Sequence, residues 1–308
     1  MPMTMIELAK SVTDPKLAGI IETLYVEETT LQYVPFRTVA GLSLSYNQEA
    51  ALPSVGFRNI NEAFAESVGV LQPMVEVLKP FGGDSDTDTV LVDAYGPQER
   101  AVYDGMFAKA MGIKYLQFML YGNSPVVAAS LPNGRAGAAY DDVKGFDGLL
   151  KRIQTAQTVD GLATGKTDGT SVFCIRFGAG FVQGLMTPKG ISQRDLGEID
   201  TKPVFRTRVD ATMGLAIFNG KAVSMVKDLA AATQVLTTTL LDNAVDLIQG
   251  KPSIILMNKR SRGQLKTSAL ATGVALGMTI DQLGNPIESW GGVPVVVSEA
   301  IINTEYNT

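Results

Sequence analysis

The chain has 308 residues, of which 45% are hydrophobic and 19% are charged, and its formal net charge is −5. This balance is typical of a folded globular protein, so it excludes a disordered chain and argues against a basic surface for tight nucleic-acid binding. The sequence has no histidine and a single cysteine, which excludes histidine-based catalytic triads, zinc clusters and an intrachain disulfide.

The first 35 residues predict a short amphipathic arm. Helices are expected over residues 4–12 and roughly 15–29, the second capped by Asp14 and begun by Pro15. The start of the chain lacks a basic segment followed by an apolar one, and no stretch has the character of a membrane span. We therefore expect neither a signal peptide nor a transmembrane segment.

Residues 36–83 predict strands around a long excursion rather than a compact domain. Residues 36–48 alternate apolar and polar side chains, as a half-exposed strand does. The next segment carries apolar residues that an isolated hairpin cannot bury, namely Leu52, Val55, Phe57, Ile60 and Phe64. Another subunit is a candidate for covering them.

Residues 96–123 predict the strongest helix, with Pro97 in its first turn and Gly122 and Asn123 at its end. Apolar residues at helical spacing predict a core-facing stripe: Val102, Met106, Ala110, Ile113 and Leu116. A loop rich in Gly, Ala and Pro follows over residues 124–150.

The second half of the chain predicts mixed α and β structure. Strands are expected in the first part of 168–184, around the apolar run 172–175, and at 213–218, 253–257, near 278–282 and 293–297; helices are expected at about 236–249 and after the capping residue Asn258. Prolines and glycines punctuate residues 185–210 and predict breaks there. Without an internal repeat or a clean linker, the chain predicts one intertwined α+β unit.

The glycine-rich stretch over residues 161–184 resembles two phosphate-binding motifs but matches neither. Gly161 and the Gly165-Lys166-Thr167 triplet are one residue too close for a Walker A loop, and a turn follows instead of a helix. The spacing of Gly178, Gly180 and Gly184 has one residue too many for a dinucleotide fingerprint, and Pro188 ends any helix after it. These glycines predict turns, and Cys174, in an apolar run, predicts a buried and inert thiol.

Three carboxylates at alternate positions, Asp84, Asp86 and Asp88, resemble the start of a calcium loop. The loop's glycine and glutamate positions hold Thr89 and Tyr95, which do not fit an EF-hand. On a strand the three would share one face, so an acidic face, solvated or between subunits, is favoured over a weak cation site. The basic cluster over 259–262 is interpreted as solvated or paired with an acidic face on a neighbour. No catalytic, cofactor-binding or metal-binding residue is predicted.

Several segments, in order along nearly the whole chain, carry a family resemblance. They are Leu52-Pro53-Ser54 with Arg58 and Asn61; the long helix with Tyr121-Gly122-Asn123-Ser124; Phe146-Asp147-Gly148-Leu149; Arg176-Phe177-Gly178 with Gly184, Pro188-Lys189-Gly190 and Asp195-Leu196-Gly197; Arg206-Thr207 and Gly214-Leu215; Met257-Asn258 with Arg262; and Gly292-Val293-Pro294. In this order they resemble the major capsid proteins of tailed phages with the Hong Kong 97-like fold, and most of all a short-tailed phage branch. The loop over 124–145 is longer than the family pattern.

The resemblance implies an α+β fold divided in a particular way. It implies an N-terminal arm over 1–35, an E-loop over 36–83, a peripheral domain over 84–160 with its spine helix over 97–122, an axial domain over 161–298 and a C-terminal tail over 299–308. These boundaries are approximate and the two domains can interleave. Intersubunit contacts are expected at Leu52, Phe57, Arg58, Asn61, Phe64, Asp84, Asp86 and Asp88.

By the same resemblance the chain is a structural protein of the virion and not an enzyme. It would assemble in the host cytoplasm, as hexamers and pentamers, into an icosahedral shell that encloses a phage genome, without a cofactor and without a membrane. Expected partners are a separate scaffolding protein, a portal, a cement or decoration protein, and packaged DNA through weak nonspecific contact. No lysine lies between Arg37 and Lys79, so the shell is expected to be held non-covalently. The alternatives are an encapsulin-type nanocompartment and, from another class, an enzyme that uses the glycine-rich stretch.

Overall fold

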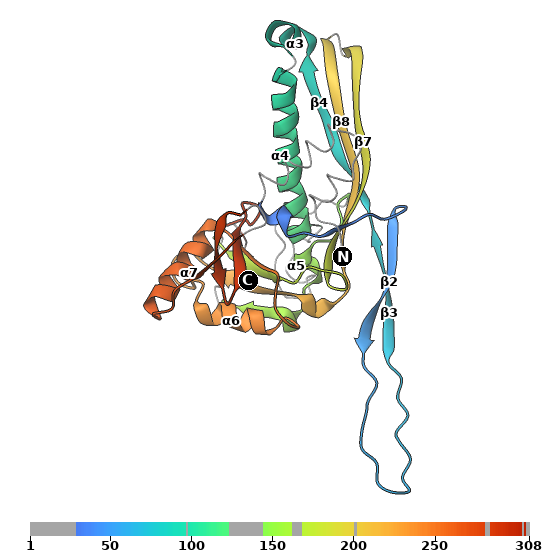
Figure 1. The fold of residues 1–308 in the computed structure, drawn as a ribbon, viewed down its shortest axis with the longest axis vertical. Helices are drawn as coiled ribbons and strands as arrows, with labels where there is room; N and C mark the ends of the chain where they lie inside the picture. The colour runs from blue at the N-terminus through green and yellow to red at the C-terminus, as the bar shows by residue number, and fades with distance from the viewer. Residues whose placement is uncertain are drawn as a thin grey trace.

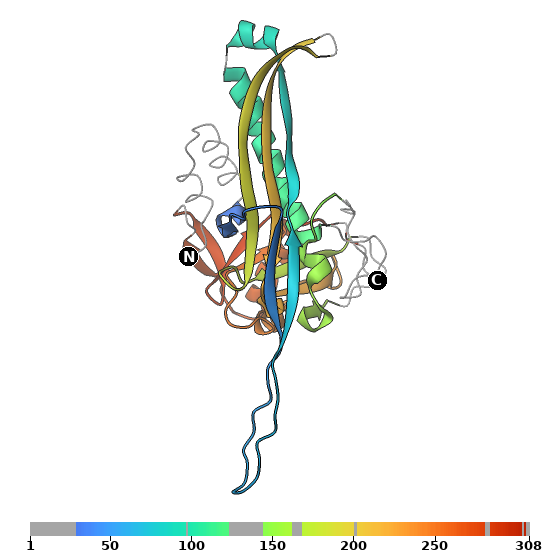
Figure 2. The ribbon, with the colours of Figure 1, turned by 90° about the vertical axis from the view of Figure 1, so that its right-hand side faces the viewer.

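The computed structural model describes residues 29–96, 98–122, 144–161, 168–199, 202–280, 284–303 and 305. The helices expected over 4–12 and 15–29, apart from Thr29 itself, and nearly all of the 124–145 loop lie outside the described residues. The described part is elongated: a long sheet and helix rise from a compact body, and a hairpin extends from the body in the opposite direction (Figures 1 and 2).

A four-stranded sheet in the order β1-β7-β8-β4 forms the long part of the molecule. Its strands are β1 (Phe36–Arg37), β4 (Lys79–Asp88), β7 (Val182–Ile199) and β8 (Lys202–Ile217). The breaks predicted over residues 185–210 were wrong, because β7 and β8 pair from Val182–Ile217 to Ile199–Lys202. The register shifts near Pro188 and again after Asp195, and such irregularities let a long strand accommodate prolines and glycines.

Two helices accompany this sheet, α3 (Thr89–Tyr95) and α4 (Gln98–Tyr121), and α4 runs along its face (Figure 1). The long helix is thus confirmed, but its expected core stripe is only partly correct. Leu116 is fully buried, whereas Val102 and Met106 are 58% and 64% exposed. The reason is that the first half of α4 stands beyond the body, and only its second half enters the core.

The compact body is built on a seven-stranded sheet in the order β11-β12-β13-β10-β6-β9-β5. Its strands are β5 (Thr158–Asp160), β6 (Thr170–Ile175), β9 (Val223–Leu229), β10 (Ile254–Met257), β11 (Gly277–Ile280), β12 (Pro286–Trp290) and β13 (Val293–Val297). Of these strands, β9 and β12 were not predicted from the sequence. The interior strand β6, between β10 and β9, is buried at every position.

The remaining helical elements are η1 (Thr29–Gln32), α5 (Leu149–Arg152), η3 (Thr155–Gln157), η4 (Gly220–Ala222), α6 (Thr238–Asp246) and α7 (Lys259–Ala271). The predicted cap of α7 is confirmed, since the side-chain oxygen of Asn258 accepts a 2.7 Å hydrogen bond from the Ser261 amide. The predicted helix over 236–249 is the shorter α6.

The hairpin consists of β2 (Ser43–Ala51) and β3 (Val70–Val77), paired antiparallel from Ser43–Val77 to Ala51–Val70. Residues 52–69 join the two strands as an exposed loop that projects away from the rest of the chain (Figures 1 and 2). Immediately after the hairpin, β4 begins at Lys79 and enters the long sheet, five residues before the expected boundary at 84.

The long sheet and the compact body are built from alternating segments of the chain, so neither part corresponds to one continuous residue range. Residues 182–199 extend from the body as β7 of the long sheet, and residues 202–217 return to it as β8. The described end of the chain also packs inward: Ala300 and Ile301 are buried, and Glu305 pairs with Gly169 beside β6.

Candidate assembly surfaces

The glycine-rich stretch forms a strand, a turn and a second strand. Gly178 and Gly180 have φ angles of +145° and +82°, in the region that favours glycine, which confirms their prediction as turn residues. At Gly184, in β7, a Cβ would lie 2.8 Å from the Phe36 ring, so glycine is needed there for close packing. Because β7 rather than a helix follows, the stretch offers no helix N-terminus to a phosphate. Residues 162–167, with the Gly-Lys-Thr triplet, lie outside the described part.

Cys174 is the penultimate residue of β6 and is fully buried, as predicted. Burial raises the pKa of its thiol to about 12, although a hydrogen bond with Ser224 opposes this shift. The reactive thiolate is therefore scarcely populated at neutral pH, and the side chain acts as an apolar filler.

The expected acidic face meets arginines of the same chain. Asp84 accepts hydrogen bonds of 2.7 and 2.8 Å from Arg208, and Asp86 accepts two of 2.6 Å from Arg206, across the β4–β8 register. The hydrogen bonds from these arginines lower the pKa of both carboxyl groups. Asp88 instead caps α3, accepting from the Val90 amide. Within the described residues no group of carboxylates is arranged to hold a metal ion, and the intersubunit role of these three aspartates stays a prediction.

The basic cluster over 259–262 also finds partners within its own chain. Lys259 pairs with Glu299 at 2.9 Å, and Arg260 donates to the Asp168 carbonyl at 2.6 Å. Arg262 donates two 2.9 Å hydrogen bonds to Glu288. These three basic side chains therefore have partners without a neighbouring subunit.

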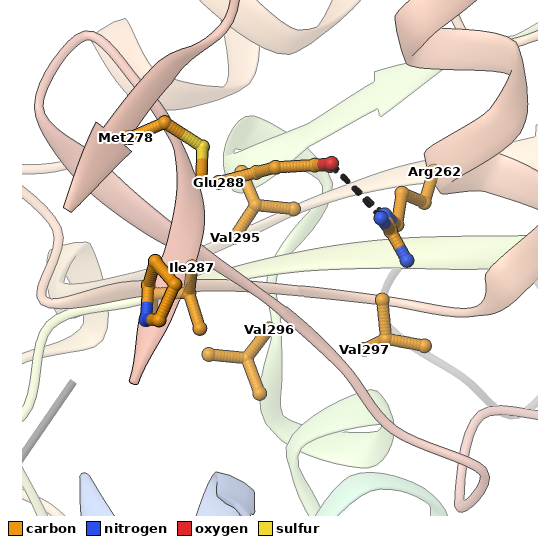
Figure 3. A pocket seen from close by; sticks show the side chains of 8 residues that line it. Arg262, Met278, Ile287, Glu288, Val295, Val296 and Val297 are labelled. Carbon is orange, nitrogen blue, oxygen red and sulfur yellow. Dashed lines mark hydrogen bonds and ion pairs between the residues drawn. The ribbon is translucent and has the colours of Figure 1, made fainter. Parts of the chain in front are cut away.

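A cavity of about 390 Å³ lies beside this last ion pair. Figure 3 shows Arg262 and Glu288 facing each other at its edge, and its other side chains are aliphatic: Met278, Pro286, Ile287, Val295, Val296 and Val297. Hydrogen bonds from Arg262, and then from Lys266, lower the pKa of Glu288 to about 2. Glu288 is thus ionised and a poor proton acceptor at neutral pH.

The hairpin loop carries six exposed large apolar side chains, including the four most exposed in the described chain. Their exposed fractions run from 65% to full exposure, and they are Leu52, Val55, Phe57, Ile60, Phe64 and Val68. Two predicted contact residues shape the loop: Arg58 donates to the Glu62 carbonyl at 3.0 Å and lies 5.0 Å from the Phe64 ring, and Asn61 has a φ of +70°. The structure thus brings Leu52, Phe57, Arg58, Asn61 and Phe64 together on one projection.

A second exposed apolar surface lies at the far end of the long sheet, and sequence reasoning missed it. It consists of Val90, Leu91, Tyr95, Val102, Tyr103 and Met106, from α3 and the first half of α4. The available signal was the helix length: a helix this long cannot bury its whole apolar stripe in one body. Apolar surfaces of this kind mark interaction sites. None of the described helices is long and apolar enough to cross a membrane.

Comparisons with known proteins agree with this picture. The model of the family described as Major capsid protein GP7 matches residues 13–308. A chain of bacteriophage Epsilon15 matches with a TM-score of 0.62 and 16% identity, over 88% of this chain and 86% of that one. The bacteriophage JBD30 capsid matches with a TM-score of 0.48 and 12% identity, over 90% of both chains. A Synechococcus elongatus PCC 7942 encapsulin matches with a TM-score of 0.44 and 11% identity, over 67% of this chain and 88% of that one. No curated protein matches.

The likeness to the Epsilon15 chain identifies the fold as the α+β Hong Kong 97-like capsid fold that the sequence resemblance implied. The GP7 family model matches nearly the whole chain, so membership in the family rests on sequence and not on the fold alone. The protein belongs to the Major capsid protein GP7 family, and it is a structural component of an icosahedral phage shell rather than an enzyme.

Proposed function

We propose that the β2–β3 hairpin is the E-loop of this capsid subunit, that α4 is its spine helix, and that the hairpin loop lies on a neighbouring copy. One observation carries the proposal: Phe57, Ile60 and Val55 are almost completely exposed, and nothing within the described chain covers them. Burying such side chains against a partner is favourable by about 1.5–3 kcal/mol for each large residue. The predicted contact residues Leu52, Arg58, Asn61 and Phe64 belong to this same surface.

The shape of the chain supports contacts between different surfaces of neighbouring copies. The hairpin loop and the apolar surface of α3 and α4 lie at opposite ends of the described molecule (Figure 1). A contact that joins two different patches of identical copies closes into a ring when the rotation fits. Hexamers and pentamers are such rings, and many modest contacts of this kind close a shell.

The shell is proposed to be held without covalent crosslinks. The segment between Arg37 and Lys79 contains no lysine, so the hairpin has no amine with which to form an isopeptide bond. In denaturing electrophoresis of mature particles, the capsid chain is expected to run as one band at its monomer mass of 32.8 kDa. A ladder of covalent multimers would contradict this proposal.

Further partners follow from the same assignment. We propose a separate scaffolding protein, a portal and a cement or decoration protein, and membership in the short-tailed branch of the family. Packaged DNA is expected to touch the chain only weakly, because the net charge is −5 and the arginines of β8 are paired with aspartates of β4. The encapsulin-type alternative has weaker support, because the matching family model is that of a phage capsid protein.

The hairpin proposal is tested by assembly of the full chain, followed by electron microscopy. Replacing both loop aromatics by serine (F57S with F64S) is expected to abolish closed shells while leaving the subunit folded, since both side chains are exposed. The matched control, F57L with F64L, retains apolar area and is expected to assemble. Normal shells from the serine variant would overturn the assignment. Nuclease-protected DNA in native particles would distinguish a phage shell from a protein-filled compartment.

A further inference from the structure

The root of the hairpin has an inverted burial pattern. In β3, Glu76 is the one buried position at 7% exposure, whereas its neighbours Val75 and Val77 are 62% and 50% exposed. A strand packed for stability alone would place its valines inward and its glutamate outward. Such a departure from the usual pattern is expected where a residue serves function.

Glu76 is held by two other segments of the chain. The guanidinium of Arg152, at the end of α5, donates two hydrogen bonds of 2.7 Å to the two carboxylate oxygens. The hydroxyl of Tyr46, on β2, lies 3.0 Å from the same carboxylate and 2.8 Å from the carbonyl of Ile217. Arg152 also donates to the Leu215 carbonyl at 3.2 Å. Both hairpin strands are therefore tied to α5 and to the end of β8.

The covalent connections at this point do not fix the hairpin by themselves. On one side β3 is joined to β4 through Leu78 alone, whose amide donates a 2.9 Å hydrogen bond to the Leu42 carbonyl. On the other side, Gly41 lies two residues before β2, with a φ of +106° and no atom within 4 Å of its Cβ position. A small apolar cluster, with Leu78, Tyr46 and Phe218, packs at the joint. Apolar packing resists separation but is not directional, whereas a two-pronged arginine–carboxylate pair fixes an orientation.

We propose that Glu76, held by Arg152 and Tyr46, is an orienting anchor that fixes the direction in which the hairpin leaves the body and hence which neighbouring copy it reaches. The assembly part of this inference rests on the proposed intersubunit role of the hairpin. Arg152, Tyr46 and Glu76 are positioning residues. The exposed loop contacts the neighbouring copy, and these three residues set the direction of the hairpin that carries the loop. A partly buried ion pair at a joint suits this task because its value lies in geometry more than in stability.

The test measures the hairpin's direction in the unassembled full chain. Spin labels at E49C on β2 and T267C on α7 report the distance between hairpin and body, and the buried Cys174 does not compete for label. E76Q and R152M are expected to raise the population of displaced hairpins roughly tenfold or more, the factor expected for losing charge-assisted hydrogen bonds. The double variant should be no worse than either single one, since the two residues act as a unit.

Two further variants keep the test decisive. E299Q breaks the exposed Lys259–Glu299 pair on the body and should leave the distances unchanged. Y46F removes one hydroxyl but keeps the ring beside Phe218, whose centroid is 4.5 Å away, and it should displace the hairpin to a smaller extent. If E76Q or R152M fails to fold, the spin-label distances of Y46F decide whether the anchor exists. Unchanged distances in folded variants would overturn the anchor.

Assembly is scored separately by electron microscopy of the same proteins. Variants with displaced hairpins are expected to yield fewer closed shells and more open or aberrant ones than the parent. Displaced hairpins with normal shells would overturn the link between direction and assembly. If the parent chain itself formed no shells, the proposed function would fail, whereas the distance measurement would still decide whether the anchor exists.

Discussion

The amide of Gly148 donates a 2.8 Å hydrogen bond to the carbonyl of Gly122, and the two backbones approach so closely that a Cβ on Gly148 would lie 2.4 Å from the Gly122 nitrogen. This contact places the end of α4 directly against the turn that begins α5. The close approach explains why glycine occupies positions 122 and 148, which both belong to the segments that carry the family resemblance. It also positions α5, which places Arg152 next to Glu76 of the hairpin.

Replacing Gly148 by alanine is therefore expected to lower the free energy of unfolding by about 2 kcal/mol or more, since the clash is with backbone and not with a flexible side chain. The matched control is Gly105→Ala in α4, where nothing lies within 4 Å of the Cβ position. That change should be neutral or stabilising by about 0.5–1 kcal/mol, because glycine is a poor helix former. Chemical denaturation of both variants checks the difference, and equal effects would contradict the close approach.

The ion pair of Glu288 predicts a pH dependence of stability. The pKa of Glu288 falls from 4.5 to about 2 on folding, chiefly through its hydrogen bonds with Arg262. A lowered carboxyl pKa contributes stability above the unfolded value, and this contribution is lost as pH falls through the folded value. Parent and E288Q should therefore differ by about 1–2 kcal/mol at pH 7, allowing for solvent screening. Denaturation as a function of pH should show this difference disappearing between about pH 4.5 and pH 2; a constant difference would contradict it.

The exposed first half of α4 predicts that folding and assembly respond differently to mutation. V102S with M106S should change the free energy of unfolding by less than about 1 kcal/mol, because both side chains are mostly exposed. Leu116→Ala, at a fully buried position of the same helix, should cost about 2–5 kcal/mol. If the far apolar surface is an assembly contact, the serine variant should also give fewer shells by sedimentation. A large loss of stability in V102S with M106S would show instead that these side chains are part of the core, as the helical spacing predicts.

The buried thiol predicts a probe of unfolding. Because Cys174 is fully buried and its pKa is about 12, a thiol reagent at pH 7–8 should react with the native chain only through unfolding. In denaturant, the thiol should react completely, whereas the native chain should stay unlabelled over the same time. Rapid labelling of the native chain, followed by mass spectrometry, would show that β6 is accessible.

The sequence determined the parts of this protein that depend on local chemistry. The apolar run around Cys174 predicts a buried strand, Asn258 predicts a helix cap, and Gly178 and Gly180 predict a turn, because each needs only its own residue type and near neighbours. The exposed hairpin residues were also predicted, since too many apolar side chains occur between Leu52 and Phe64 for a hairpin to bury. The ordered motifs identified the family.

Only the tertiary structure decided which distant segments meet. Prolines and glycines within 185–210 predicted breaks, yet pairing along β8 holds β7 as one long strand, because cross-strand hydrogen bonds outweigh local preference. Asp84 and Asp86 suggested a shared acidic face, but the register of β4 on β8 gave each an arginine. Glu76 had no visible role in the sequence, because its partners Arg152 and Tyr46 lie 76 and 30 residues away along the chain. Long-range register, not residue type, determined the partners of these charges.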